Sequence, residues 1–304
     1  FPDCSAIIAG DYSNDISFSN NLNNYQSSAR RDFFAKITSG GVWSYVLFIA
    51  EHSPNLGVAT NSDNTAIVTG SYSGASLTFG STSISNYNNG RSVYVAKINA
   101  AGSWVWAKTS GVFSDDESEH EIISSGVATL SDGSALIKGT YTGYVTFSNS
   151  LSLNYDNSGH HDSFIAKISK DGLWESVGRI YSCDKVDTRG IAIIESSSLE
   201  EDNFAFVVGD FSSTSNCPLS FVPSDISSSG YTSTNIFVTK INHVAGSSPT
   251  SQPTSQPTSQ PTSQPSERRP TTRPSGQPSS QPSGEPSSRP SLKPTGQPSS
   301  QPSG

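Results

Sequence analysis

The chain has 304 residues, of which 33% are hydrophobic and 14% charged, against roughly 45–50% and 25% in typical globular domains. Its net charge of −8 argues against nucleic acid as the main partner, since phosphate binding needs clustered Lys and Arg. No apolar run approaches the roughly 18 residues that a membrane-spanning helix needs, so we expect no membrane span.

Residues 1–246, called the head below, contain four repeats in which two motifs occur four times and two further motifs occur three times, in the same order. A strand-like segment ends in Gly-X-aromatic, with its glycine at Gly10, Gly70, Gly139 and Gly209. Next comes aromatic-X-(Ala/Thr)-Lys-Ile, with its lysine at Lys36, Lys97, Lys167 and Lys240. A turn glycine followed by Trp comes third, at Trp43, Trp104 and Trp174. A segment of small residues comes fourth, starting at Gly57, Gly126 and Gly190. Chance recurrence of four ordered motifs is negligible, so the head is built of repeats.

Each repeat is predicted to hold four short strands: a small-residue strand, the Gly-X-aromatic strand, the Lys-Ile strand and the Trp strand. Polar segments at 61–64 and 131–134 are typical of hairpin turns. The longer connection between the second and third strands is predicted to carry a mini-strand, around Phe18, Phe79, Phe147 and Phe221. Short strands without a helical period favour an all-β fold, a β-propeller-like head of four repeats with four-stranded blades.

The two ends of the repeat series are incomplete. Repeat one has no small first strand, and repeat four has no Trp strand. An open strand edge is a template for pairing with another chain. We therefore expect a neighbouring subunit, or chain preceding Phe1, to cover one of these edges.

Three cysteines are present, and an odd number leaves one without a partner in this chain. Cys183 lies in the connection entering repeat four, and Cys217 lies in the connection between its second and third strands. Both connections emerge on one face of a propeller, which favours a Cys183–Cys217 disulfide, with Cys4 free or intermolecular. If the ends of the head meet in a closed ring, Cys4–Cys217 is the alternative.

Few side chains suggest chemistry. The acidic segment 115–121 offers oxygen atoms for Ca²⁺ but lacks the spacing of an EF-hand, and a solvated loop is the simpler interpretation. His160 and His161 stand beside Asp162 without a third ligand placed by the sequence. The repeated lysines are expected to pack their stems between blades. Known catalytic motifs are missing from the sequence, so we expect no enzyme, no cofactor and no metal site.

Residues 247–304, called the tail below, form a tetrapeptide array with proline at nearly every fourth position. Such a segment has almost nothing apolar to bury. Polyproline II is the expected conformation, and at about 3.1 Å per residue the segment 249–302 would reach roughly 170 Å. With three residues per turn and a period of four, hydroxyl groups point to every side. This geometry suits a rod coated with sugar, whereas the simpler interpretation is a flexible or semi-rigid linker.

The head and tail contain no Asn-X-Ser/Thr sequon, so any glycan is expected to be O-linked. The candidate attachment sites are Thr250, Ser251, Thr254, Ser255, Thr258, Ser259, Thr262, Ser263, Ser279, Ser280, Ser287, Ser288, Ser299 and Ser300. If prolines are hydroxylated, the candidates are Pro253, Pro257, Pro261, Pro278, Pro282 and Pro298.

The head motifs, a strand ending in Gly-X-Tyr and the series aromatic-Val-Ala-Lys-Ile before Gly-X-Trp, resemble β-propeller repeats of secreted and surface-attached proteins. The tail resembles the Pro-Ser-Ser-Gln arrays of extracellular proteins from heterokont algae and oomycetes, including cell-surface and flagellar-hair components. These resemblances imply an extracellular structural glycoprotein, with copies of itself, other fibril subunits and O-linked glycans as partners. The alternative is a carbohydrate-binding or adhesive propeller displayed on a passive stalk.

Overall fold

The computed structural model describes residues 1–18, 25–53, 55–86, 90–112, 121–154, 161–182, 185–194, 204–212, 219–222, 224–228 and 235–242. All of them belong to the compact unit Phe1–Thr250. Their regular structure consists of β-strands, and the named strand pairs are antiparallel. In this described part of the chain, no helix of the length and hydrophobicity needed to cross a bilayer occurs. The prediction of an all-β fold is confirmed.

Repeats two and three contain the four expected main strands, in sheets whose order follows the chain. Repeat two consists of β4 (Gly57–Thr60), β5 (Ala66–Tyr72), β8 (Ser92–Ile98) and β9 (Trp104–Thr109), with the added hairpin β6 (Ser76–Phe79) and β7 (Thr82–Ser85). Repeat three consists of β11 (Ile122–Thr129), β12 (Ala135–Tyr141), β15 (Asp162–Ile168) and β16 (Trp174–Tyr181), with the added pair β13 (Val145–Ser148) and β14 (Leu151–Leu153). The short β10 (Gly111–Val112) pairs with β13.

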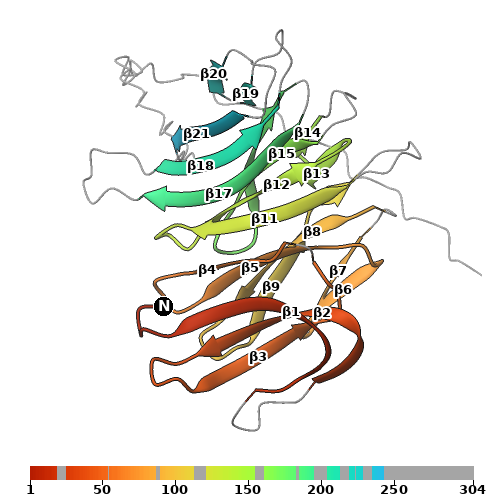
Figure 1. Cartoon of the computed structure of the whole chain (residues 1–304), viewed down its shortest axis with the longest axis vertical. Helices are drawn as coiled ribbons and strands as arrows, with labels where there is room; N and C mark the ends of the chain where they lie inside the picture. The colour runs from red at the N-terminus through yellow and green to blue at the C-terminus, as the bar shows by residue number, and fades with distance from the viewer. Residues whose placement is uncertain are drawn as a thin grey trace, which may run out of the picture. The chain divides into compact units, whose positions relative to one another are not determined.

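Repeats one and four have three main strands each among the described residues, as the missing motifs predicted. Repeat one consists of β1 (Ala6–Ile16), β2 (Tyr25–Ile37) and β3 (Trp43–Ile49). Repeat four consists of β17 (Val186–Ile194), β18 (Phe204–Phe211) and β21 (Asn235–Asn242), with the hairpin β19 (Leu219–Val222) and β20 (Ser224–Ser228). The β19 strand pairs with β16, so repeat four extends the sheet of repeat three. Figure 1 shows the main sheets following one another in chain order.

The mini-strand prediction is wrong at Phe18 and confirmed at the other three positions. Phe79, Phe147 and Phe221 lie in β6, β13 and β19. In repeat one, β1 and β2 instead pair from Ala6 and Ile37 out to Ile16 and Tyr25, and Phe18 follows the end of β1. The pairing continues because the register shifts between Tyr12 and Asn14, where Asn14 has a φ of +72°.

The first two motifs of each repeat form one structural unit. Each motif glycine lies directly across the sheet from a motif aromatic residue, as Gly10–Phe33, Gly70–Tyr94, Gly139–Phe164 and Gly209–Phe237. A Cβ atom on Gly10 would lie only 2.9 Å from the Phe33 ring, and the rings obstruct the other three glycines as well. The glycine is therefore needed because an aromatic ring on the neighbouring strand covers its Cα.

The mini-hairpin phenylalanines complete small aromatic clusters. Phe79 packs its ring 5.3 Å from Tyr94 and 4.9 Å from Trp104, measured between centroids. Phe147 repeats this geometry with Phe164 and Trp174 at 5.4 and 5.1 Å. Most of these contacts are edge-to-face or tilted, which aromatic quadrupoles favour. The Trp motif, the aromatic motif and the hairpin thus pack as a single cluster in each of these repeats.

The turn at 1–5 has the same hydrogen bonds as the hairpin turns at 61–65 and 130–134. In all three, an aspartate Oδ1 accepts a hydrogen bond from the backbone N–H two residues later: Asp3 from Ser5, Asp63 from Thr65 and Asp132 from Ser134. The first residues of repeat one therefore adopt the turn that joins the first and second strands in repeats two and three.

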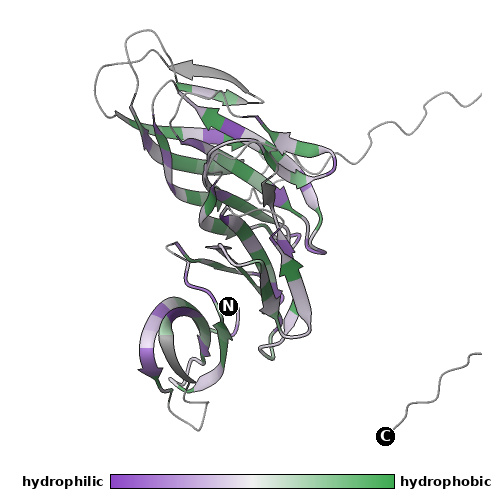
Figure 2. Ribbon diagram, turned by 90° about the vertical axis from the view of Figure 1, so that its right-hand side faces the viewer, coloured by the Kyte–Doolittle hydropathy of each residue, from purple (hydrophilic) through white to green (hydrophobic). Residues whose placement is uncertain are grey.

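Neighbouring repeats pack through opposite faces of their sheets. We call the face toward the preceding repeat the leading face and the face toward the following repeat the trailing face. On repeat two, Ile67, Val93 and Val95 belong to the trailing face and pack in one core with Ile137 and Phe164 from the leading face of repeat three. Figure 2 shows apolar residues along the strands of successive sheets. The hydrophobic core is thus divided into layers between repeats.

Candidate functional site

Most residues singled out in the sequence lie outside the described part of the chain. These include Cys183, Cys217 and every candidate attachment site of the tail, from Thr250 to Ser300. Cys4 is described, and its free thiol is exposed in the turn at 1–5 with a φ of +59°. The Cys183–Cys217 pairing therefore stays a prediction.

The two candidate cation sites are only partly described. From the acidic segment, Glu121 forms an ion pair with Arg91, with Nε and Oε1 3.1 Å apart. Asp162, next to His161, is buried and accepts hydrogen bonds from Arg179 Nε at 2.8 Å and Nη2 at 2.6 Å. Both guanidinium nitrogens of Arg179 contact the same oxygen of this carboxylate, Oδ2, in a charge-assisted contact. Among the described residues, no group of three or more His, Cys, Asp or Glu side chains could hold a metal ion.

The repeated lysines behave as predicted in three of the four repeats. Lys36, Lys97 and Lys167 are buried, and their Nζ atoms lie 3.4, 3.9 and 3.0 Å from Asp3, Asp63 and Glu175. Lys240, at the same position of repeat four, is exposed. The prediction of a buried stem is wrong for Lys240, because it lies on the trailing face of the last repeat.

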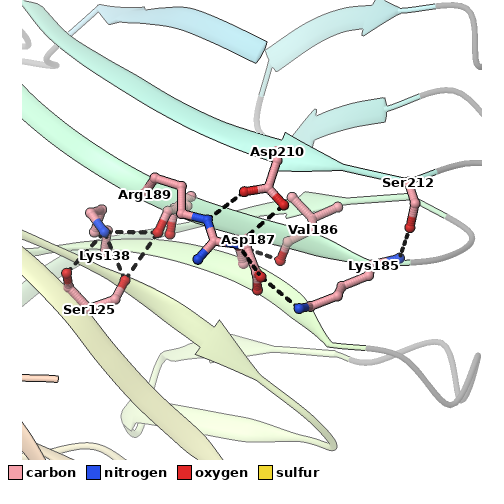
Figure 3. A network of polar contacts seen from close by, with 10 residues as sticks. Ser125, Lys138, Lys185, Val186, Asp187, Arg189, Asp210 and Ser212 are labelled. Atoms are coloured by element: carbon pink, nitrogen blue, oxygen red, sulfur yellow. Dashed lines mark hydrogen bonds and ion pairs between the residues drawn. The ribbon is translucent and has the colours of Figure 1, made fainter. Parts of the chain in front are cut away.

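The densest polar cluster lies between repeats three and four and centres on Lys138, in the middle of β12 (Figure 3). Lys138 is only 2% exposed. Its Nζ donates hydrogen bonds to Ser125 Oγ at 2.8 Å, to the Ser125 carbonyl at 3.0 Å and to the Thr188 carbonyl at 2.9 Å. Ser125 belongs to repeat three and Thr188 to repeat four, so the ammonium group ties the first strands of two repeats together.

The backbone leaves room for this lysine at Gly126, where a Cβ atom would lie 2.9 Å from Lys138 Cε. Both β11 and β17 shift register just before their motif glycines, Gly126 and Gly190. Burial lowers the pKa of Lys138 to about 8, and the charge of Arg189 acts in the same direction. The three acceptors nevertheless engage the N–H groups of Lys138 Nζ. The geometry therefore supports a structural role for Lys138 rather than a role as a nucleophile.

A second, exposed group of charges continues the cluster on repeat four (Figure 3). Arg189 forms ion pairs with Asp210 and with Asp187, the latter with Nη2 and Oδ2 3.2 Å apart. Lys185 Nζ lies 2.7 Å from Asp187 Oδ2. The hydrogen bond to Asp210 raises the pKa of the Arg189 guanidinium. These contacts fix the start of β17 against β18.

Other polar contacts link repeats two and three. Thr129 Oγ1 donates to the carbonyl of Thr60, its counterpart in repeat two, at 2.8 Å. Ser124 N–H donates to Ser71 Oγ at 3.1 Å. Trp106 Nε1, on β9, donates to the Lys170 carbonyl at 3.0 Å. Several polar side chains of the head therefore join repeats two and three.

One carboxyl group in repeat one has an unusual pKa. Asp32 is fully buried and accepts hydrogen bonds from Ser53 N at 2.9 Å, with His52 Nδ1 at 3.2 Å from its other oxygen. Burial raises the pKa of Asp32 to about 6 despite these partners. The group holds the connection after β3 against β2.

Sequence reasoning missed Lys138 and Asp32, because neither belongs to a repeated motif. The positions equivalent to Lys138 hold Ala9, Thr69 and Val208. A lysine among small and apolar residues of a central strand was the available signal, and it indicated a buried cation with partners.

Comparison with known families gives one match, to a family described as "PT disordered repeat", at residues 269–304. The match lies in the tail and supports a repeat segment rich in proline and hydroxyl residues. No curated protein matches the chain.

Proposed function

We propose that the chain is a non-enzymatic structural glycoprotein of the extracellular space. It would form a subunit of a glycan-coated fibril or of a cell-surface or flagellar appendage. In this proposal the head is the assembly or decoration module and the tail is an O-glycosylated spine. The observation that carries the proposal is the proline at nearly every fourth position of the tail, with Ser or Thr beside it.

The head supports a mechanical role. Two of its buried ionic side chains, Lys138 and Asp162, are held by hydrogen bonds, between repeats for the first and within a repeat for the second. Strand orders β4-β5-β8-β9 and β11-β12-β15-β16 are those of meandering propeller blades. We therefore propose that the repeats are propeller-type blades whose packing layers give the head its rigidity.

In the tail, sugar would supply the stiffness that the peptide lacks. A polyproline II segment has no internal hydrogen bonds, and the family matched at residues 269–304 is described as a disordered repeat. Bulky glycans on all sides would exclude compact conformations. The spine of the proposed fibril is thus the modified tail rather than the bare peptide.

Glycopeptide and intact-mass analysis of the chain, secreted from a eukaryotic host, tests this proposal. We expect mass increments of whole sugar residues confined to peptides from 247–304. An unmodified tail would contradict the proposed spine. Selective binding of the intact chain to a glycan array would favour the carbohydrate-binding alternative instead.

A further inference from the structure

The internal junctions of the head are built alike. At each one, the trailing face of one repeat packs on the leading face of the next. Phe34 of repeat one packs with Val68 of repeat two, Val95 of repeat two packs with Ile137 of repeat three, and Ile165 of repeat three packs with Val207 of repeat four. The internal junctions therefore show what covers a trailing face in this molecule.

The trailing face of repeat four carries exposed apolar side chains. Its Val238 corresponds to Phe34, Val95 and Ile165, which are 0%, 0% and 8% exposed, whereas Val238 is 66% exposed. Ile236 is 84% exposed, although its counterparts in the other repeats are 0% exposed. Val208, on the adjacent strand β18, adds to the same patch at 36%. Contiguous exposed apolar side chains of this kind mark interaction surfaces.

The leading face of repeat one is the matching surface at the other end of the series. Its Ile8 is 42% exposed, whereas the counterparts Val68, Ile137 and Val207 are 0% exposed. The strand keeps the pattern Ala-X-Ile-X-Gly-X-Tyr that forms the leading face of repeat three, Ala135–Tyr141. Among the described residues, repeat one thus presents the second and third strands of the face that covers a trailing face at each internal junction, without the first strand.

We propose that a second copy of this chain occupies these end faces. The trailing face of repeat four in one copy packs on the leading face of repeat one in the next copy, and the apolar contacts resemble those that the second and third strands make at an internal junction. The inference rests on the proposed structural role, for which it names the partner. The chain's own repeat one does not cover Ile236 or Val238, and the tail offers almost no apolar side chains for them.

This contact joins two different surfaces, so it is heterologous and can continue from copy to copy. A substitution at one end consequently leaves the other end intact. A charged residue at Ile8 blocks the leading face, and one at Val238 blocks the trailing face. A mixture of the two variants retains one intact pair of faces.

The experiment uses the full chain with Ile8→Asp, Val238→Asp and the control Leu173→Asp, followed by sedimentation velocity over a series of concentrations. Leu173 is 65% exposed in the turn before β16 and belongs to neither end face. We expect wild type and Leu173→Asp to form species larger than dimers with rising concentration. Each end-face variant alone stays monomeric, and their equimolar mixture forms dimers and nothing larger.

Wild type that stays monomeric at every concentration would overturn the proposal, as would continued association of either end-face variant alone or a mixture that stays monomeric. Circular dichroism and Trp fluorescence check the fold, and Ile8→Ser with Val238→Ser replace any Asp variant that fails to fold. A monomeric chain whose tail carries sugar would overturn the stacking alone. An assembling chain with a bare tail would overturn the glycan spine alone.

Discussion

The inner repeats, two and three, share motifs and strand pairings with the terminal repeats, one and four. The two pairs differ in how far the faces of their sheets are buried. Val95 and Val238 occupy the same place in the third strand, three residues before the isoleucine that ends the motif. The first is completely buried, and the second is two-thirds exposed, at 66%. The same residue type at the same position therefore has opposite surroundings.

The difference shows that burial at this position comes from the neighbouring repeat. Repeat proteins behave in this way because each unit cannot bury its apolar faces alone. Among the described residues, repeats two and three have a neighbouring repeat on each side, whereas repeats one and four have one each. Substitutions at equivalent positions of different repeats should therefore change the free energy of unfolding by different amounts.

The largest expected effect comes from the motif glycine of repeat three, which has a first strand beside it, whereas the described part of repeat one has none. A Cβ atom at Gly139 would collide with the Ile123 carbonyl and the Phe164 ring, whereas at Gly10 it meets only the half-buried Phe33 ring. We expect Gly139→Ala to lower the free energy of unfolding by about 4 kcal/mol and Gly10→Ala by about 1–2 kcal/mol. Denaturant titration followed by Trp fluorescence measures both. Equal losses would show that the carbonyl of Ile123, on the first strand that repeat one lacks among the described residues, adds no constraint at this glycine.

The second effect comes from Lys138 at an inner junction. Its pKa in the folded state is about 8, below the ordinary 10.5, so the folded state favours the neutral amine. Its stabilising contribution is present above pH 10.5 and is lost as the pH falls through 8. Relative to Lys138→Met, wild type should gain up to about 3 kcal/mol of unfolding free energy between pH 8 and 10.5. Parallel curves for the two proteins would contradict the burial of this amine.

Asp32 in terminal repeat one should show the opposite trend at acid pH. Its pKa in the folded state is about 6, above the ordinary 3.8, so its stabilising contribution is complete below pH 3.8 and is lost as the pH rises through 6. Wild type should lose about 2–3 kcal/mol of unfolding free energy relative to Asp32→Asn between pH 4 and 6. Thermal unfolding of both proteins across this interval measures the difference. A constant difference would show that the carboxyl is solvated.

Val95 and Val238 test the comparison most simply. Val95→Ala opens a cavity between repeats two and three and should lower the unfolding free energy by about 2 kcal/mol. Val238→Ala should change it by less than about 0.5 kcal/mol in dilute solution, because the side chain is exposed in the single chain. Denaturant titration at low protein concentration provides the values. Losses of similar size would remove the distinction between inner and terminal faces.

The smallest effect belongs to the exposed ion pairs of repeat four. Arg189→Ala should lower the unfolding free energy by about 0.5 kcal/mol, since surface pairs with exposed partners contribute little. The loss should shrink further at 1 M salt because of screening. Thermal unfolding at two salt concentrations checks this. A loss of unfolding free energy larger than that caused by Val95→Ala would show that this charged cluster stabilises the head more than the apolar packing between repeats does.

The sequence predicted the strands of the head well where its motifs recur. Motif glycines, aromatic residues and tryptophans located the main strands of repeats two and three and the strands missing from repeats one and four. Phe18 was placed in a strand wrongly, because the bulge between Tyr12 and Asn14 lets β1 and β2 pair beyond the usual length. A register shift of this kind depends on the backbone conformation at one residue. The repeated sequence motifs do not predict that conformation.

The polar ties could not be predicted, because each depends on contacts distant in sequence. Lys138 bonds to the Thr188 carbonyl, 50 residues away. The motif pattern also does not indicate which repeat has its trailing face covered by a neighbour, because Val95 and Val238 are the same residue type at the same motif position. The number of neighbours, and not the local sequence, decides that outcome.

Hydroxyl-radical footprinting of the intact chain tests the end faces most directly, because it reports the exposure of individual side chains. At low concentration, Ile8, Ile236 and Val238 should all be oxidised. As concentration rises, the account predicts that the three lose their label together, while the exposed controls Leu173 and Val105 keep theirs. Undiminished labelling of Val238 and Ile8 at every concentration would contradict the claim that copies of the chain cover each other's terminal repeats.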